Sequence, residues 1–139
     1  MKVFLDTNII LDFYDSNRGH FMPSAIVFDL ALKKKIELYA CAQSFITAFY
    51  ILRKVYEKDE LYRSMTGLYD LCHVTPVNAA IIEKALKLKG RDFEDTCQYC
   101  SSIDSDVDII LTRDKKGYEE FDIRHISAEE FVSEFLNAM

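Results

Sequence analysis

Short runs of consecutive apolar residues alternate along the chain with longer segments in which apolar residues recur every three or four positions. The first run, Val3-Phe4-Leu5, stops abruptly at Asp6. Such a run without polar alternation is typical of a strand buried on both faces of a parallel sheet. The pattern predicts further strands at residues 36–40, 72–76, 109–112 and 122–126.

Between these strands the spacing of apolar residues predicts helices. The expected helices lie at residues 9–16, from about 23 to 33, from 43 or 44 to 58, 59–71, 79–89, 93–103 and after residue 127. Strands that alternate with helices are typical of an α/β fold with a mainly parallel sheet. The 139 residues are enough for one ordinary domain, so we expect a single domain over residues 1–139.

Small polar residues mark the expected helix ends. Ser44, Asn78, Asp92 and Ser127 stand where N-caps are expected, and Gly90 stands where a helix would end. The residue three positions after Asp92 is also an aspartate, which fits the first turn of a helix.

Composition and charge narrow the class of protein. Half of the residues are apolar and 29% are charged, and no run approaches the roughly 18 apolar residues of a membrane span. Asp6 also interrupts any signal-peptide pattern at the start, so we expect a cytoplasmic protein without membrane contact. The net charge of −6 argues against binding nucleic acid through phosphate neutralisation alone, but permits an enzyme that acts on nucleic acid through bound cations.

Four cysteines are too few for a disulfide scaffold. Cys97 and Cys100 have C-x-x-C spacing but lie inside a predicted helix, which disfavours a redox role. Cys72-His73 lacks a second pair with zinc-finger spacing, so buried thiols are the better interpretation.

Three aspartates are placed so that they can meet at one edge of the predicted sheet. Asp6 follows the first strand, Asp114 follows the strand at residues 109–112, and Asp95 lies in the first turn of the helix before that strand. Ligands of α/β proteins bind at the carboxyl ends of the strands, and clustered carboxylates suit Mg²⁺ or Mn²⁺. The competing interpretation is that Asp6 and Asp95 only cap helices.

Three motifs in this order resemble those of the PIN-domain family, and most closely its VapC-like bacterial branch. The motifs are Val3-Phe4-Leu5-Asp6-Thr7-Asn8, Phe93-Glu94-Asp95-Thr96 and Ile110-Leu111-Thr112-Arg113-Asp114. The resemblance extends over nearly the whole chain, as far as the C-terminal helix.

The resemblance implies a PIN fold, which is a three-layer α/β/α sandwich, and the activity of a Mg²⁺- or Mn²⁺-dependent endoribonuclease. It implies RNA as substrate and, for the toxin of a toxin–antitoxin pair, an antitoxin protein as partner. By this similarity Asp6, Asp95 and Asp114 would be the catalytic metal ligands, with Asn8 and Thr112 as supporting polar groups.

One position departs from the family pattern. Many members carry a glutamate in the helix after the second strand, and the matching residue here is Thr47. Three consequences are open. Thr47 contributes through a water molecule, or Asp92 or Glu94 takes the place of the missing carboxylate, or the affinity for the metal is reduced. The alternative function is therefore a weakly active or inactive PIN-fold module that binds a protein or RNA partner.

Other possibilities carry less support. Aspartyl-phosphate chemistry at Asp6 would require a second aspartate two residues later, where Asn8 stands. Arg113 and Lys115 are candidates for contacting the substrate phosphate, although each also fits an exposed cation. The aromatic residues of segment 44–71, together with the family resemblance, suggest a homodimer.

Overall fold

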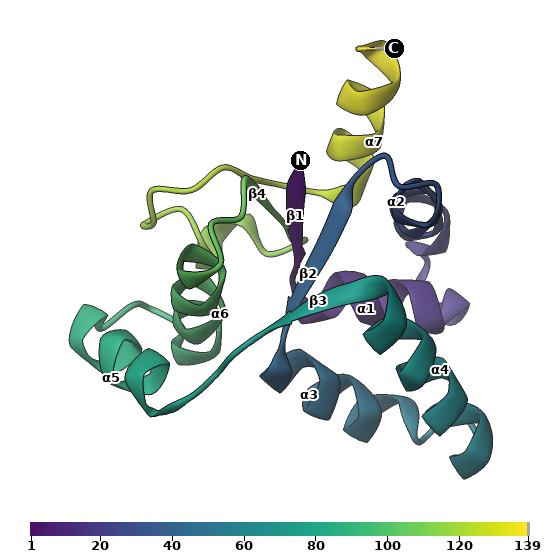
Figure 1. Ribbon diagram of the computed structural model, residues 1–139, viewed down its shortest axis with the longest axis horizontal. Coiled ribbons are helices and arrows are strands. Elements are labelled where there is room, and N and C mark those ends of the chain that lie inside the picture. The colour runs from purple at the N-terminus through teal and green to yellow at the C-terminus, as the bar shows by residue number, and fades with distance from the viewer. Residues whose placement is uncertain (139) are drawn as a thin grey trace.

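The computed structural model describes residues 1–138 and contains a five-stranded sheet with the strand order β3-β2-β1-β4-β5 (Figure 1). Every pair of neighbouring strands is parallel. The strands are β1 (Lys2–Leu5), β2 (Glu37–Cys41), β3 (Cys72–Thr75), β4 (Ile109–Leu111) and β5 (His125–Ile126). The helices are α1 (Thr7–Tyr14), α2 (Phe21–Leu32), α3 (Ala42–Leu52), α4 (Lys58–Leu71), α5 (Ala79–Leu88), α6 (Phe93–Asp104) and α7 (Ala128–Asn137), with short 3₁₀ turns η1 (Ser16–Arg18) and η2 (Lys115–Gly117).

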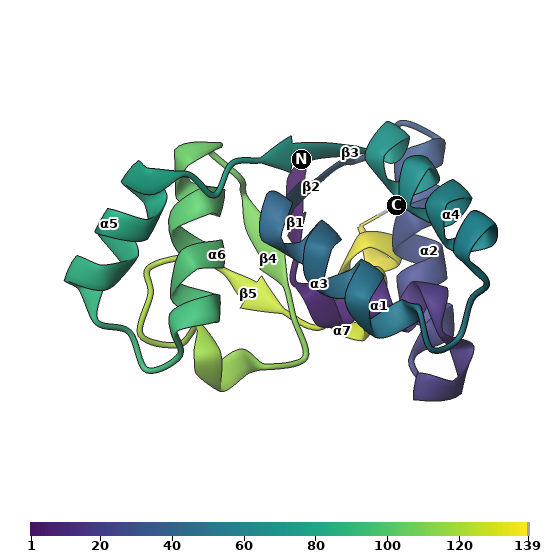
Figure 2. The same cartoon turned by 90° about the horizontal axis from the view of Figure 1, so that it is seen from below.

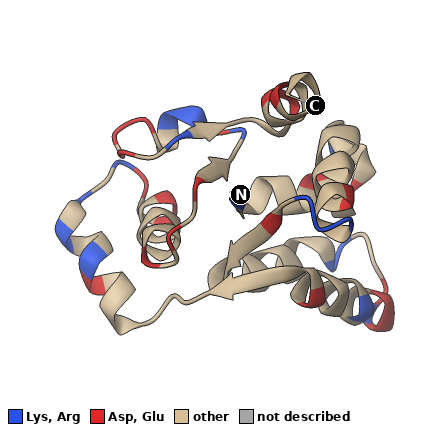
Figure 3. Ribbon diagram, turned by 45° about the horizontal axis from the view of Figure 1, so that its top comes forward, with Lys and Arg blue, Asp and Glu red and all other residues tan. Residues whose placement is uncertain are grey.

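Helices cover both faces of the sheet, so the predicted three-layer α/β/α architecture is confirmed. Figure 2 shows α5 and α6 on one side of the strands and α1 to α4 with α7 on the other. Charged residues lie mainly on the helices and loops, and the strands are largely free of them (Figure 3). None of the helices within residues 1–138 is both long and apolar enough to cross a membrane.

Alternate side chains of each central strand enter different cores, which explains the uninterrupted apolar runs. Val3 and Leu5 belong to the large core under α1 and α2, whereas Phe4 between them faces the α6 side. Ile110 in β4 likewise enters the α6 side, while its two neighbours enter the large core. Because both faces of the sheet are buried, the strands that lead to the candidate site are packed on two sides.

The predicted boundaries of α3 are wrong at both ends. Cys41 rather than Ser44 occupies the N-cap position, and the helix ends at Leu52 rather than near residue 58. Ser44 lies buried in the first turn, where its hydroxyl is 2.7 Å from Thr7 Oγ1. The expected cap is therefore used for a contact between α3 and α1.

The helix α5 ends just before Gly90, as predicted, but the left-handed conformation at this end is adopted by Lys89 (φ 53°) and not by the glycine. A Cβ atom at position 90 would lie 2.1 Å from Thr96 Oγ1. A glycine is thus required for the close approach of this loop to α6. The other three predicted caps are confirmed by side-chain hydrogen bonds: Asn78, Asp92 and Ser127.

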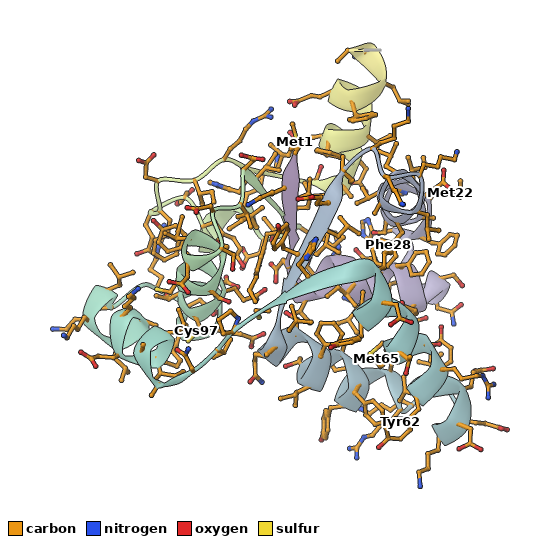
Figure 4. The ribbon with its side chains drawn as sticks, in the orientation of Figure 1. Met1, Met22, Phe28, Tyr62, Met65 and Cys97 are labelled. Carbon is orange, nitrogen blue, oxygen red and sulfur yellow. The ribbon has the colours of Figure 1, made fainter. Side chains whose placement is uncertain are left out.

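Three tyrosines of α3 and α4 lie outside the core. Tyr50, Tyr62 and Tyr69 are 58%, 55% and 64% exposed, and they line a groove of about 590 Å³ between the two helices. We call this surface, with Phe45, Ile46 and Phe49 also in it, the α3–α4 groove. Figure 4 shows Tyr62 and Met65 of α4 near α3, and Cys97 on α6 across the molecule.

All four cysteines are buried and free, and Cys97 and Cys100 lie inside a helix, α6, as predicted. Burial raises the pKa of both thiols above its usual value, which keeps them protonated and poorly reactive.

Candidate active site

Asp6 stands directly after β1. Its side chain caps α1 and also lines the cleft described below, so the two interpretations of this residue do not exclude each other. Its carboxylate is 4% exposed and accepts four hydrogen bonds. Oδ1 accepts from Thr7 N at 2.6 Å and Gln98 Nε2 at 2.9 Å, and Oδ2 accepts from Thr112 Oγ1 at 2.6 Å and Asn8 Nδ2 at 3.3 Å. These donors come from three separate segments and fix the orientation of the carboxylate.

Asp114 is tied to Asp6 through Thr112. The Thr112 hydroxyl donates to Asp6 and accepts from Asp114 N at 2.9 Å. Asp114 Oδ1 in turn accepts from Gly117 N at 3.2 Å and so caps the short turn η2. The segment after β4 is thereby folded back toward the end of β1.

Asp95 is positioned by the first turn of α6. Its backbone N–H donates to the Asp92 carboxylate at 2.9 Å, which caps the helix. Asp95 Oδ2 is buried and has no hydrogen-bond partner within residues 1–138. A Cβ atom at Gly117 would lie 2.0 Å from this oxygen and 2.8 Å from Asp114 Oδ2, so both carboxylates approach the same bare Cα.

The aspartates surround one small cleft of about 290 Å³ at the carboxyl edge of the sheet. Six of the seven residues singled out from the sequence line it: Asp6, Asn8, Thr47, Asp92, Asp95 and Asp114. The seventh, Thr112, is fully buried behind Asp6. Glu94 also lines the cleft.

Burial and crowding of like charges raise the pKa of three carboxyls at the cleft, those of Asp6, Glu94 and Asp95. Burial is the main cause of the raised pKa of Asp6, opposed by its hydrogen bonds from Thr112, Gln98 and Thr7. Burial, followed by the nearby charges of Asp6 and Asp92, raises the pKa of Asp95 to about 8. A site of this kind gains from a bound cation, which removes the repulsion between carboxylates.

These residues fit a hard divalent cation. The donors are carboxylate oxygens, which suit Mg²⁺ or Mn²⁺ rather than zinc. Within residues 1–138 no three Asp, Glu, His or Cys side chains form a ready-made metal cluster. Mg²⁺ commonly binds through one or two carboxylates and keeps several waters, so Asp95 and Asp114, with the free Asp95 Oδ2, meet its requirements.

The cations that were candidates for a phosphate contact are engaged elsewhere. Arg113 donates from Nε and a terminal nitrogen to the buried Asp12 at 2.8 and 3.0 Å, and Arg18 donates to the same carboxylate at 2.9 Å. Lys115 pairs with Glu130 of α7. Arg113 therefore anchors the segment after β4 to α1.

Two buried polar residues that support the segments around the cleft were not identified from the sequence. Gln98 lies one helical turn after Asp95, a spacing that places both on the same face of α6. Asp12 is an isolated acidic residue in an apolar helix, and its 1% exposure is explained only by its two arginine partners.

Comparison with known proteins agrees with this geometry. The family model described as PIN domain matches residues 2–116. The chain is 30% identical over 135 residues to a protein named Ribonuclease VapC1 from Aquifex aeolicus, covering 94% of this chain and 92% of the relative.

Solved structures share the fold at low sequence identity. The crystal structure of VapC20 from Mycobacterium tuberculosis, described as a Sarcin-Ricin loop cleaving toxin, matches with a TM-score of 0.68 at 12% identity, over 88% of this chain and 98% of that one. The structure of VapBC-1 from nontypeable Haemophilus influenzae matches with a TM-score of 0.67 at 14% identity, over 93% and 99% of the two chains. With the family match over most of its length, this chain belongs to the PIN-domain family, in its VapC-like branch.

Proposed function

We propose that this protein is a Mg²⁺- or Mn²⁺-dependent endoribonuclease that hydrolyses phosphodiesters of RNA. One observation carries the proposal: three aspartates from distant segments surround a single cleft, and one of them holds a buried oxygen without a partner. The relative from Aquifex aeolicus is named a ribonuclease, and this name supports the same activity here.

In this proposal Asp6, Asp95 and Asp114 are the catalytic metal ligands. A bound divalent cation supplies the positive charge that activates a water and stabilises a phosphoryl centre. The protein itself fixes the orientation of these carboxylates. Asn8 and Thr112 donate hydrogen bonds that orient Asp6. Asp92 caps the first turn of α6, which carries Asp95. The fixed carboxylates need little reorganisation during the reaction, which is the usual source of electrostatic catalysis.

Thr47 lies in the cleft where many family members carry a glutamate, and its hydroxyl accepts from Gln43 Nε2 at 3.3 Å. A hydroxyl in this place can order a water but adds no negative charge. This residue is the specific reason to retain a second candidate function, a weakly active or inactive module that binds an RNA or protein partner.

Cleavage of a mixed single-stranded RNA by wild type and by Asp6→Asn, in Mn²⁺, Mg²⁺ or EDTA, tests the proposal. We expect wild type to cut only with a divalent cation and Asp6→Asn to lose at least about 100-fold in rate while staying folded, since a group essential to charge stabilisation is lost. Equal cutting by the variant would contradict the site. No cutting by folded wild type under any condition would favour the binding module.

We further propose a cytoplasmic toxin that is held by an antitoxin protein and forms a homodimer. The similar protein from Mycobacterium tuberculosis is described as a toxin, which supports the first part. The exposed aromatic residues of the α3–α4 groove support a protein partner at this face.

A further inference from the structure

A second cavity of about 270 Å³ adjoins the carboxylate cleft, and we call it the α6 cavity. Thr7 and Glu94 line both spaces, so the two lie side by side at these residues. The cavity lies between the starts of α3 and α6 and the N-terminal part of α5. A chain molecule bound in the cleft would place its neighbouring group at the α6 cavity.

One side of the α6 cavity is apolar and suits a flat ring. Val77, Ile82 and Cys97 form its inner wall. Phe93, the first residue of α6, lies at the cavity and is 48% exposed, although a phenylalanine normally gains by burial. Nucleobases stack on such rings, commonly adding about tenfold or more in affinity per base.

The polar side of the cavity offers one available charged group, the Glu94 carboxylate. Ser44 and Gln98 are engaged: the Ser44 hydroxyl lies 2.7 Å from Thr7 Oγ1, and the Gln98 amide donates to Asp6. Gln43 donates to Thr47. No hydrogen bond engages the Glu94 carboxylate within residues 1–138, which leaves an acceptor that favours a ligand with N–H donors and repels phosphate.

We propose that the α6 cavity holds one unpaired nucleobase of the RNA, next to the phosphodiester in the carboxylate cleft, and prefers bases with an exocyclic amine to uracil. This inference builds on the proposed nuclease function. The volume lies just below the roughly 300–1,000 Å³ of pockets for larger ligands, which suits a base rather than a whole nucleotide. Adenine, cytosine and guanine each carry an exocyclic amine that can donate to Glu94, whereas uracil carries carbonyl acceptors and a single ring N–H, so Glu94 favours the bases with an amine.

Sequencing of the ends produced from a randomised single-stranded RNA measures this preference. We expect wild type to favour adenine, cytosine or guanine over uracil at one position beside the cut by about tenfold, as one charged hydrogen bond allows. Glu94→Gln, whose amide both donates and accepts, reduces this ratio to within about twofold. Phe93→Ala raises KM by about tenfold, in line with lost stacking.

Phe21→Ala is the matched control, because Phe21 is likewise the partly exposed first residue of a twelve-residue helix, α2. It should leave both the base ratio and KM unchanged. A base ratio that is flat in wild type, or that Glu94→Gln leaves intact, would overturn the inference while the nuclease function stands.

A second measurement needs no cleavage and separates the two proposals. Adenosine, cytidine or uridine is titrated into metal-free wild type carrying labelled methyl groups, and the signals of Val77 and Ile82 are followed. Shifts with adenosine and cytidine that exceed those with uridine support the cavity assignment, even if the protein cuts no RNA. Methyl signals that stay unchanged up to the solubility limit of each nucleoside would overturn the cavity assignment, even if cleavage is metal-dependent.

Discussion

Ionisation of Asp95 is opposed both by burial and by neighbouring negative charges. Its Oδ2 is buried without a partner, and the charges of Asp6, Asp92 and Asp114 all act on it. The resulting pKa of about 8 means that the carboxyl binds a proton in the folded protein at pH values where an unfolded aspartate is ionised. In the metal-free protein, the ionised form of this carboxyl is therefore less favourable in the folded state than in the unfolded state.

This imbalance predicts how stability changes with pH. Between about pH 4 and 8 the folded state binds more protons at Asp95 than the unfolded state does, so the free energy of unfolding falls as the pH rises. Asp95→Asn removes this loss, and without divalent cations it should be more stable than wild type at pH 8 by on the order of 2 kcal/mol.

Urea unfolding in EDTA at pH 4, 6 and 8 checks this expectation. The advantage of Asp95→Asn should shrink toward pH 4, because wild-type Asp95 is then protonated in the folded state. A variant that is less stable than wild type at pH 8 would refute the raised pKa.

At the residue scale the sequence predicted which aspartates meet in the cleft better than the residues that support them. Asp6, Asp95 and Asp114 are recognisable from local motifs, since each has a fixed place relative to a strand or helix end. Gln98 reaches Asp6 across 92 positions, and that contact depends on how α6 packs on the sheet. Local pattern holds no information on such a distant hydrogen bond.

At the scale of elements, the Asp12–Arg113 ion pair joins α1 to the segment that follows β4. Asp12 is 1% exposed, and Arg113 supplies two of its three hydrogen bonds. A buried carboxylate that loses its partner is costly, whereas replacing both partners by apolar residues often is not.

A double-mutant cycle tests this connection by thermal or urea unfolding. Arg113→Met should destabilise the protein by about 2–3 kcal/mol, and Asp12→Leu with Arg113→Met should recover most of that loss. Arg91→Met, which removes an exposed pair with Glu119, is the control and should change little. Additive effects of the two substitutions would show that the pair does not couple α1 to the site.

Ser44 and Gly90 have roles that differ from their predicted ones for the same reason. Ser44 is a good cap by its chemistry, but its hydroxyl is used by Thr7, and α3 begins two residues earlier. Gly90 fits a helix end, but its lack of a side chain is needed against Thr96. In both cases the local chemistry of the residue permits more than one role, and a contact with a distant part of the chain determines which role it has.

For the whole molecule, the alternation of apolar runs and helical periodicity was sufficient to predict a parallel sheet with its site at the carboxyl edge. The pattern could not predict which helix faces stay exposed. The apolar residues of α3 lie on nearly every side of that helix, and Ile46 and Tyr50 remain 65% and 58% exposed in the α3–α4 groove. A surface of this kind is typical of a contact with another protein.

Sedimentation of the isolated protein tests the proposed homodimer. We expect a dimer at micromolar concentration, and Ile46→Lys should shift it to the monomer because a charge is costly in an apolar contact. Leu86→Lys is the control, since Leu86 is 60% exposed on α5 and lies outside the groove. A monomer at every concentration would argue against this interface.

The most direct measurement for the central claim is a calorimetric titration of wild type with Mn²⁺ at pH 7.5. The site predicts a binding heat that Asp95→Asn weakens by at least about tenfold, because one carboxylate ligand is lost. Asp29→Asn, on the surface of α2, should bind as wild type does. No heat from the folded wild type, or equal binding by Asp95→Asn, would contradict the assignment of these aspartates as a metal site.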